Sequence, residues 1–472
     1  MKLAALLVCF CSLAIGQDVA TKIKSEAMDH SQVAPVFEMF TVNIGPRLTA
    51  SPAQKRAAEY ARDRLAAYGL ENAHLEPWHF GRGWTLEKLT LEMVEPRYMP
   101  LIGYADGWSP STSGEITASP IWVAGKSATE LPSIKGAIVM TDPVMTTFIR
   151  KDRPNPSDPS YEPMSAAYAT SVGGARGGGG RGAAAAIAQA IRAAGPAVIL
   201  KPSRGEHGTV FVTGRDGGPG AIPTITMAAE HYDMIAAMLQ HNVPVKLRIN
   251  VQTKFYDSDN GNAYNVIAEL PGSDLKDEVV MIGGHLDSWH TGVGATDNAD
   301  GATTVMEAMR ILKAIGAKPR RTIRVALWSG EEQGLLGSKA WVENHRNEAP
   351  RIDVYYNIDN GTNKIYGWYL QNMASVQDLF NQWLEPMKAI GARRNVIEPV
   401  GSTDHLSFID AGVPGFNPIQ DYGNYDIRTH HTNMDTNERL DVNDIREAAA
   451  VMAWFAYSSA TQDARIPRPA AK

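Results

Sequence analysis

Cysteine is almost absent from this sequence of 472 residues, which contains only Cys9 and Cys11. Both lie in the apolar stretch at the N-terminus, which has the character of a segment that is removed from the mature protein. We therefore expect the mature chain to have no cysteine, which excludes a disulfide, a thiol nucleophile and a metal site with cysteine ligands. Any metal ion must then be bound by histidine, aspartate and glutamate side chains.

A strong excess of charge is also missing, because 45 lysines and arginines stand against 51 aspartates and glutamates, a formal net charge of −6. This balance argues against a nucleic-acid-binding protein, which usually carries a basic surface. Hydrophobic residues make up 44% of the chain and charged residues 20%, which is typical of a globular protein that buries a core without cross-links. No segment after the N-terminus approaches a membrane span.

The N-terminus has the pattern of a secretory signal peptide. Lys2 supplies a positive charge, residues 3–15 form an apolar run, and the small residues Ala14 and Gly16 precede the expected cleavage site. The run is shorter than the ~20 residues that cross a bilayer, although an uncleaved N-terminal anchor is the alternative. We predict that residues 1–16 are removed and that the protein is secreted or periplasmic, with no stable membrane insertion.

In the rest of the chain, the pattern of apolar and polar residues changes twice. From about residue 256 short apolar runs alternate with helical spacing, with strands expected at 279–282, 322–328 and 353–358 and a helix at 303–315. This alternation predicts an α/β fold with a doubly wound, mixed and mostly parallel sheet that is covered on both faces. Nearer the N-terminus, Ser51 in front of a proline predicts the start of a helix.

We expect four parts after the signal peptide. Residues 17–106 and 253–460 form the N-terminal and catalytic parts of one domain, residues 107–252 form an inserted β-rich domain, and residues 461–472 form a flexible tail. The insert contains a glycine-rich run at 173–182, which lacks the ending of a phosphate-binding loop and is better interpreted as a mobile loop or hinge.

Acidic and histidine side chains follow the predicted strands at the ends where open α/β sheets bind ligands. The candidates are His285, Asp287, Asp297, Glu331, Glu332, Asp359 and His431. Each has an ordinary interpretation by itself, because a Glu-Glu pair is usually a solvated surface and an Asp after a strand is often a helix cap. Their joint occurrence at the ends of strands favours a metal site.

Zinc accepts exactly these ligand types, imidazole nitrogen and carboxylate oxygen, and a carboxylate with two oxygens can bridge two ions. A water molecule between two ions loses its proton more easily and needs a base to accept it. In the pair Glu331-Glu332, one carboxylate can bind metal while the other transfers the proton. Asp287 can accept the second N–H group of His285 and orient its ring.

Five motifs resemble the di-zinc exopeptidase family related to aminopeptidase Y and glutamate carboxypeptidase. They are GHLDSW at 284–289, GATDNADGA at 294–302, LWSGEEQG at 327–334, NID at 357–359 and HTNMDT at 431–436. Trp289 and the double histidine His430-His431 are shared with one branch of that family. The resemblance implies two zinc ions, and it implies that Asp297 bridges them.

The same resemblance implies roles for the remaining candidates. His285 and Asp359 share one zinc, Glu332 and His431 share the other, Glu331 is the catalytic base, and the ligand is His431 rather than His430. It also implies a cis peptide bond after Asp297, hydrolysis of short peptides, most of all dipeptides with free ends, and a homodimer. Carboxypeptidase or dipeptidase activity is favoured over aminopeptidase activity, although no residue fixes which end of the peptide is held.

Further roles and other functions stay open. The insert resembles a protease-associated domain that caps the catalytic cleft, and its Arg176 and Arg181 are better interpreted as solvated than as substrate ligands. His405 and one of Tyr422 and Tyr425 are weak candidates for a supporting role and for oxyanion binding. Glutaminyl cyclases have a similar fold with one zinc, and receptor-like relatives are binding proteins that have lost metal ligands.

Overall fold

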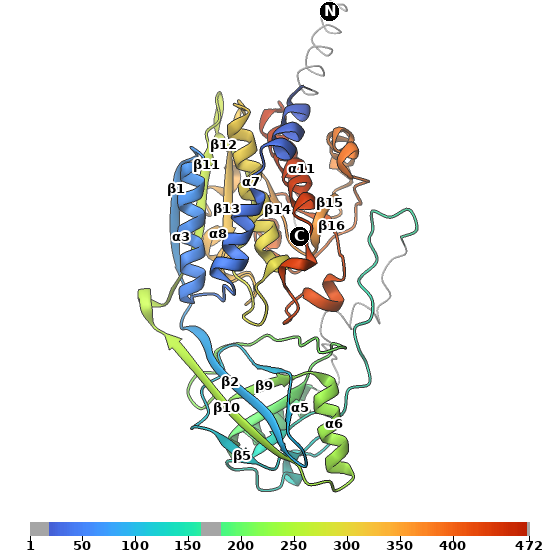
Figure 1. The fold of residues 1–472 in the computed structure, drawn as a ribbon. Helices are drawn as coiled ribbons and strands as arrows, with labels where there is room; N and C mark the ends of the chain where they lie inside the picture. The colour runs from blue at the N-terminus through green and yellow to red at the C-terminus, as the bar shows by residue number, and fades with distance from the viewer. Residues whose placement is uncertain (1–17, 162–180, 470–472) are drawn as a thin grey trace, which may run out of the picture.

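The computed structural model describes residues 18–161 and 181–469. The predicted signal peptide and most of the glycine-rich run, including Arg176, lie outside these residues. Two bodies are connected by long strands (Figure 1), and the larger one is built on a seven-stranded sheet in the order β1-β11-β13-β12-β14-β16-β15. Its strands are β1 (Glu71–His79), β11 (Asn262–Leu270), β12 (Leu275–His285), β13 (Arg321–Trp328), β14 (Ile352–Asn357), β15 (Thr362–Tyr369) and β16 (Gly415–Asp421).

The four central strands β13, β12, β14 and β16 are parallel to one another. Strands β11 and β15 run antiparallel to their inner neighbours, and β1 pairs antiparallel with β11 and so points the same way as the centre. The predicted mixed, mostly parallel α/β sheet is therefore confirmed. All six residues of β14 are buried, as expected for a strand with both faces covered.

Helices cover both faces of this sheet. In β12, Val280 and Ile282 pack in one apolar core with α2, α3, α7 and α11, whereas Val279 and Met281 pack in another with α8 and α10. Figure 1 shows α3, α7 and α11 in front of the strands. These helices are α2 (Val33–Glu38), α3 (Pro52–Ala67), α7 (Asp300–Ala314), α8 (Leu336–Asn344), α10 (His405–Asp410) and α11 (Val442–Thr461).

The predicted helix start at Ser51 is confirmed. Helix α3 begins at Pro52, and the Ser51 hydroxyl accepts a hydrogen bond from the backbone N–H of Gln54 at 3.2 Å. This contact satisfies one of the backbone donors that every helix leaves free in its first turn. The helix packs on the sheet through Ala57, Ala61 and Leu65, which are fully buried.

The smaller body contains a four-stranded antiparallel sheet, β3-β2-β10-β5, and a five-stranded mixed sheet, β4-β9-β8-β7-β6. Its elements are β2 (Gly83–Glu95), β3 (Met99–Pro100), β4 (Gly103–Ala105), β5 (Ile116–Ala118), β6 (Ile121–Trp122), β7 (Ile138–Met140), α5 (Arg181–Ala194), β8 (Val198–Pro202), β9 (Thr224–Met227), α6 (Ala229–Gln240) and β10 (Lys246–Tyr256). Strands β2 to β4 precede residue 107, where the sequence predicts that an inserted domain begins. The likeness to a protease-associated domain stays a prediction.

The C-terminal tail differs from the flexible segment expected over 461–472. The backbone N–H of Ile466 donates to Asp353 Oδ1 at 2.8 Å, and the Ile466 side chain is buried. Arg468 donates to the carbonyl oxygens of Gly412 and Pro350. The segment packs against the larger body as far as Arg468, because one apolar residue and its flanking arginines find partners there.

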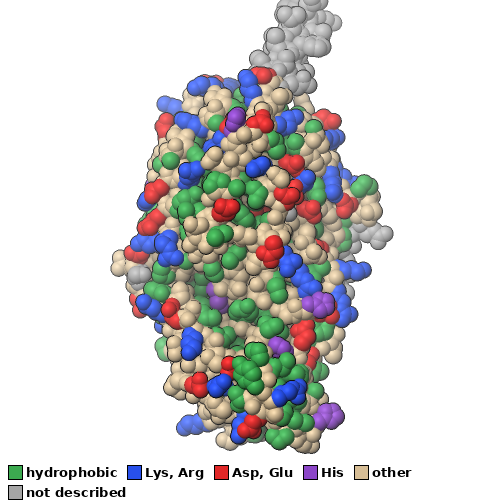
Figure 2. All heavy atoms as spheres, in the orientation of Figure 1, with side chains coloured by type: hydrophobic (Ala, Val, Ile, Leu, Met, Phe, Trp, Pro, Cys, Tyr) green, Lys and Arg blue, Asp and Glu red, His purple; other side chains and the backbone are tan. Residues whose placement is uncertain are grey.

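Among the described residues, no helix combines the length and hydropathy that crossing a bilayer requires. Figure 2 shows blue and red side chains interspersed over the visible face. On this face neither sign of charge predominates.

Candidate metal centre

Five chain segments deliver the candidate ligands to one edge of the sheet. His285 is the last residue of β12, Glu331 and Glu332 follow the end of β13, and Asp359 follows the end of β14. Asp297 lies in the π-helical turn η4 (Ala295–Ala299) in front of α7, and His431 follows the turn η8 (Tyr425–Thr429). Parallel neighbours end at the same edge, so residues far apart in sequence come together there.

Asp297 lies between the two histidines. Its Oδ1 atom is 3.1 Å from His285 Nε2, and its Oδ2 atom is 3.4 Å from His431 Nε2. Each histidine also faces a carboxylate of its own, since His285 Nε2 is 3.6 Å from Asp359 Oδ1 and His431 Nε2 is 2.8 Å from Glu332 Oε2. The arrangement therefore has two halves that share one aspartate.

Several polar atoms in this cluster lack hydrogen bonds although they are buried. Within residues 18–161 and 181–469, these atoms are His285 Nε2, Asp297 Oδ2 and both carboxylate oxygens of Glu332. Buried polar atoms without hydrogen bonds are costly, and the histidines that face these carboxylates carry a charge only when protonated, so such atoms call for an ion. Imidazole nitrogens and carboxylate oxygens are the donors that zinc accepts, and this set has enough of them for two ions.

The pKa values of the buried carboxylates also favour bound cations. Burial raises the pKa of Glu332 well above its usual value, and the carboxylate of Asp297 raises it further. Burial also raises the pKa of Glu331, and nearby Asp359 and Asp404 add to this effect against the opposing charge of His285. Carboxylates crowded in this way need positive charge to stay ionised together, which divalent cations supply.

Glu331 lies beside the ligands. Its Oε2 atom is 4.0 Å from His285 Nε2, a longer distance than those that join the histidines to Asp297, Asp359 and Glu332. Its side chain is 9% exposed, so the carboxylate is largely buried with the cluster. Glu331 is therefore near the candidate ligands but is not among their closest contacts.

Asp287 has a different set of partners from the one expected. Its carboxylate accepts hydrogen bonds from the Thr49 hydroxyl at 2.8 Å and from the backbone N–H groups of Glu331 and Glu332 at 3.3 and 3.4 Å. His285 Nδ1 donates instead to the Asp287 backbone carbonyl at 3.0 Å, while the carboxylate is 3.7 Å away. Asp287 thus orients the histidine through its backbone and the Glu331-Glu332 segment through its side chain.

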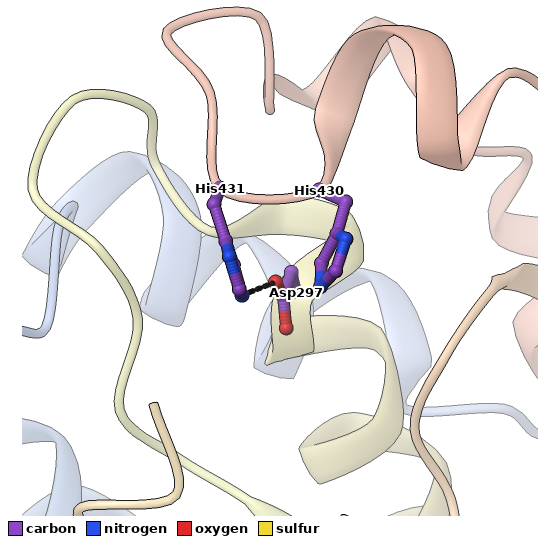
Figure 3. A group of neighbouring side chains, drawn as sticks. All are labelled: Asp297, His430 and His431. Carbon is purple, nitrogen blue, oxygen red and sulfur yellow. Dashed lines mark ion pairs between the residues drawn. The ribbon is translucent and has the colours of Figure 1, made fainter. Parts of the chain in front are cut away.

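Both neighbouring histidines approach Asp297. Figure 3 shows His430 and His431 on one loop with their rings directed toward Asp297, and one nitrogen of each and an Asp297 oxygen all lie within 4.8 Å of one another. The His430 ring stacks on Tyr425, with 4.9 Å between ring centroids, whereas His431 contacts both Asp297 and Glu332. The contacts favour His431 as the ligand, with His430 packed behind it.

The smaller body holds the loop that carries His431. The backbone N–H of Val212 donates to the His431 carbonyl at 2.9 Å, and Phe211 and Thr432 form an antiparallel β-bridge. The Asn433 backbone N–H donates to the Val210 carbonyl at 3.2 Å, and the Val210 backbone N–H donates to Asn433 Oδ1 at 2.7 Å. His431 itself has a φ of 62°, which is uncommon for a residue with a side chain, so these contacts stabilise an unusual backbone.

The weaker candidates have packing partners. His405 donates through Nε2 to the Val400 carbonyl at 3.0 Å, and the Tyr422 and Tyr369 hydroxyls are 2.8 Å apart. Tyr425 is buried under His430. The predicted cis peptide bond between Asp297 and Asn298 is confirmed.

Comparison with known proteins gives a consistent picture. The sequence pattern described as peptidase family M28 matches residues 265–456. The chain is 30% identical over 431 residues to carboxypeptidase Q from Rattus norvegicus, covering 90% of this chain and 84% of that protein. It is 28% identical over 429 residues to carboxypeptidase Q from Homo sapiens, with 90% and 84% covered. Carboxypeptidase Q, also called plasma glutamate carboxypeptidase, is the branch that Trp289 and the double histidine indicate.

Solved structures agree. A peptidase M28 precursor from Shewanella amazonensis is 26% identical, with a TM-score of 0.76 over 97% of this chain and 99% of that one. The zinc aminopeptidase BSAP from Bacillus subtilis shares the fold at 20% identity, with a TM-score of 0.62 over 91% of this chain and 95% of that one.

Proposed function

Because this chain belongs to peptidase family M28, we propose that it is a secreted exopeptidase with two zinc ions that hydrolyses short peptides. Dipeptides with free ends are the favoured substrates, and carboxypeptidase or dipeptidase activity is favoured over aminopeptidase activity. The observation that carries the proposal is the position of Asp297, whose two oxygens face two different histidines at 3.1 and 3.4 Å. A single-zinc cyclase would not need a carboxylate shared in this way.

The residues present fit the two ions. His285 and Asp359 would bind one, Glu332 and His431 would bind the other, and Asp297 would contact both. When bound, the ions would polarise the peptide carbonyl and make the attacking water molecule more acidic. Asp287 keeps the ligands in place, since it bonds to the backbone of both glutamates and its carbonyl fixes the His285 ring.

Glu331 would transfer the proton. It is close to the ligands but farther from His285 than Asp297 is, so its carboxylate stays available to accept a proton from the attacking water. Burial raises the pKa of Glu331, which makes its carboxylate a stronger base for that proton. As the C–N bond breaks, the leaving amine takes the proton from Glu331, and the acid product keeps the oxygen of the attacking water.

Short substrates agree with the way the smaller body meets the metal centre. The segment at Val210–Val212 bonds directly to the loop of His431 and Asn433, so the chain encloses the site on that side. Trp289 packs edge-on against both His431 and Trp108, with 6.1 and 6.3 Å between ring centroids. These contacts put part of the smaller body against His431, which would favour short substrates over a long polypeptide.

The test is hydrolysis of alanyl-alanine by protein whose metal has been removed and then restored. We expect the metal-free protein to be inactive and zinc to restore hydrolysis, because the ions would polarise the peptide carbonyl. Full activity in protein from which all metal has been removed would contradict the proposal.

Replacing Asn433 by alanine should weaken zinc binding. The substitution removes the side-chain oxygen that accepts the Val210 N–H, so the loop of His431 loses part of its support. Residues that orient metal ligands typically contribute 10–100-fold in metal affinity, and we expect a loss of roughly that size. Competition with a coloured chelator measures it. The matched control is Asn443→Ala at the exposed start of α11, which should leave zinc affinity unchanged.

A further inference from the structure

A buried arginine, Arg47, bonds to the loop that joins the ligands His285 and Asp297. It lies between the turn η1 (Met39–Ile44) and helix α3, and its side chain has no exposed surface. Burial lowers the pKa of Arg47 to about 10, while nearby carboxylates, first among them that of Asp435, act in the opposite direction. The guanidinium is therefore still a cation at neutral pH.

The side-chain nitrogens of Arg47 all donate to backbone carbonyl oxygens. Nε donates to Leu286 at 2.9 Å, and Nη2 donates to Gly294 at 2.8 Å. Nη1 donates to Val293 at 2.8 Å and to Gly45, on the arginine's own segment, at 3.0 Å. One side chain thus connects the N-terminal segment of the larger body to both ends of the loop.

The loop at residues 286–294 contains no helix or strand that could fix its shape. It starts directly after His285 and stops just before the turn that carries Asp297. Buried carbonyl groups such as those of Leu286 and Gly294 need hydrogen-bond donors, and Arg47 supplies them. Because a guanidinium is planar and rigid, its nitrogens hold the two ends of the loop at a fixed separation.

The backbone of Arg47 bonds to the same loop. Its N–H group donates to the Ser288 hydroxyl at 3.0 Å, and its carbonyl accepts from the Ser288 backbone N–H at 3.3 Å. The fit is close, since a Cβ atom on Gly294 would lie 2.9 Å from Nη2 of Arg47. The arginine therefore has little freedom to move relative to the loop.

Asp435 holds the same loop from its other partners. Its backbone carbonyl accepts from the Val293 N–H at 2.9 Å, and its carboxylate accepts from the N–H groups of Thr296 at 2.7 Å and Asp297 at 3.1 Å. Asp435 belongs to the segment that carries His431. The end of the loop fixed by Arg47 is thus connected to the second half of the metal centre as well.

We propose that Arg47 is a positioning residue that sets the spacing between His285 and Asp297, so that the shared aspartate reaches both zinc ions. The proposal rests on the proposed two-zinc function. The two oxygens of Asp297 face His285 at 3.1 Å and His431 at 3.4 Å, and a shift of either loop end would change one of these distances.

The experiment measures zinc affinity and zinc separation in wild type, Arg47→Lys and Arg47→Met. Lysine keeps the positive charge, but its single nitrogen cannot bond to both ends of the loop. We therefore expect both variants to bind zinc about 10–100-fold more weakly in competition with a coloured chelator. X-ray absorption at the zinc edge should show a metal–metal distance of about 3.5–4 Å in wild type, which is lost or lengthened in Arg47→Lys.

Arg321→Lys is the matched control. Arg321 is also buried, at 1% exposed, and donates to the carbonyl oxygens of Ser459 at 3.3 Å and Gln462 at 2.6 Å. It begins β13, at the end of the strand opposite to Glu332. This variant should lower the melting temperature, while zinc affinity and zinc separation stay at their wild-type values. The comparison separates the positioning of ligands from the stability of the fold.

Two results would overturn the proposal. One is wild-type zinc affinity and zinc separation in Arg47→Lys, and the other is an equal loss of zinc affinity in Arg47→Lys and Arg321→Lys. If Arg47→Lys does not fold, Ser288→Ala decides, because it removes the hydroxyl that accepts from the Arg47 backbone and leaves the arginine in place. Unchanged zinc affinity in that variant would then overturn the proposal.

These results concern the variants alone and leave the peptidase function standing. Failure of the proposed function would be seen in wild type instead, as binding of a single zinc ion or as no hydrolysis of any dipeptide by the zinc-loaded protein. A wild-type chain that binds one zinc ion removes the role of Arg47 along with the two-zinc site.

Discussion

Glu331→Gln is expected to lower turnover of a dipeptide by about 10²–10⁴-fold while zinc content stays at the wild-type level. Glutamine has nearly the same shape as glutamate but accepts no proton at neutral pH. The carboxylate lies 4.0 Å from His285 Nε2, beyond the closer contacts of Asp297 and Asp359 with that nitrogen. Its loss should therefore remove proton transfer and leave the ligands in place. Steady-state kinetics and metal analysis on the same preparation measure both quantities.

A matched control for this variant is Glu343→Gln on α8, an exposed glutamate that pairs with Arg346. It should have wild-type kinetics. Turnover that survives in Glu331→Gln would remove Glu331 from the role of base. Lost zinc would instead make Glu331 a ligand and reassign the pair Glu331-Glu332.

Asp297→Ala is expected to have the second large effect, the loss of both zinc ions together with activity. Asp297 contacts both histidines, so its removal takes a ligand from each half of the centre. Without Asp297, the buried carboxylates of Glu332 and Asp359 would have one fewer neighbouring ligand with which to bind an ion. Activity should fall at least as far as in Glu331→Gln, and the melting temperature should no longer rise when zinc is added.

The control for this variant is Asp277→Ala, because the Asp277 side chain is 86% exposed to solvent. It should bind zinc as wild type does. If Asp297→Ala still holds two zinc ions, then the aspartate does not bridge them. If it holds one ion, the two halves are more independent than the shared carboxylate implies.

The pattern of the sequence predicts, for a simple reason, that candidate ligands meet at one edge of the sheet. Apolar runs mark the buried strands β12, β13 and β14, and polar residues directly after such runs must emerge at the same edge of a parallel sheet. His285, Glu332 and Asp359 follow from this argument alone. Asp297 and His431 lie on loops, where the spacing of strands does not predict the position of a side chain. Only the resemblance to a family identifies them.

Contacts between the two bodies are what the sequence does not reveal. Val210 and Asn433 lie 223 positions apart, and nothing in either local segment indicates that they bond. Asp287 shows a subtler limit, since its spacing from His285 predicts a carboxylate contact but the turn between them presents the backbone carbonyl instead.

Zinc titration of metal-free protein, with bound zinc and dipeptide hydrolysis followed together, tests the central claim most directly. A site in which one aspartate serves two histidines should bind two zinc ions per chain, and hydrolysis should reach its maximum only as the second ion binds. Saturation at one zinc per chain with full activity, or binding of two ions with no hydrolysis of any dipeptide, would contradict the account.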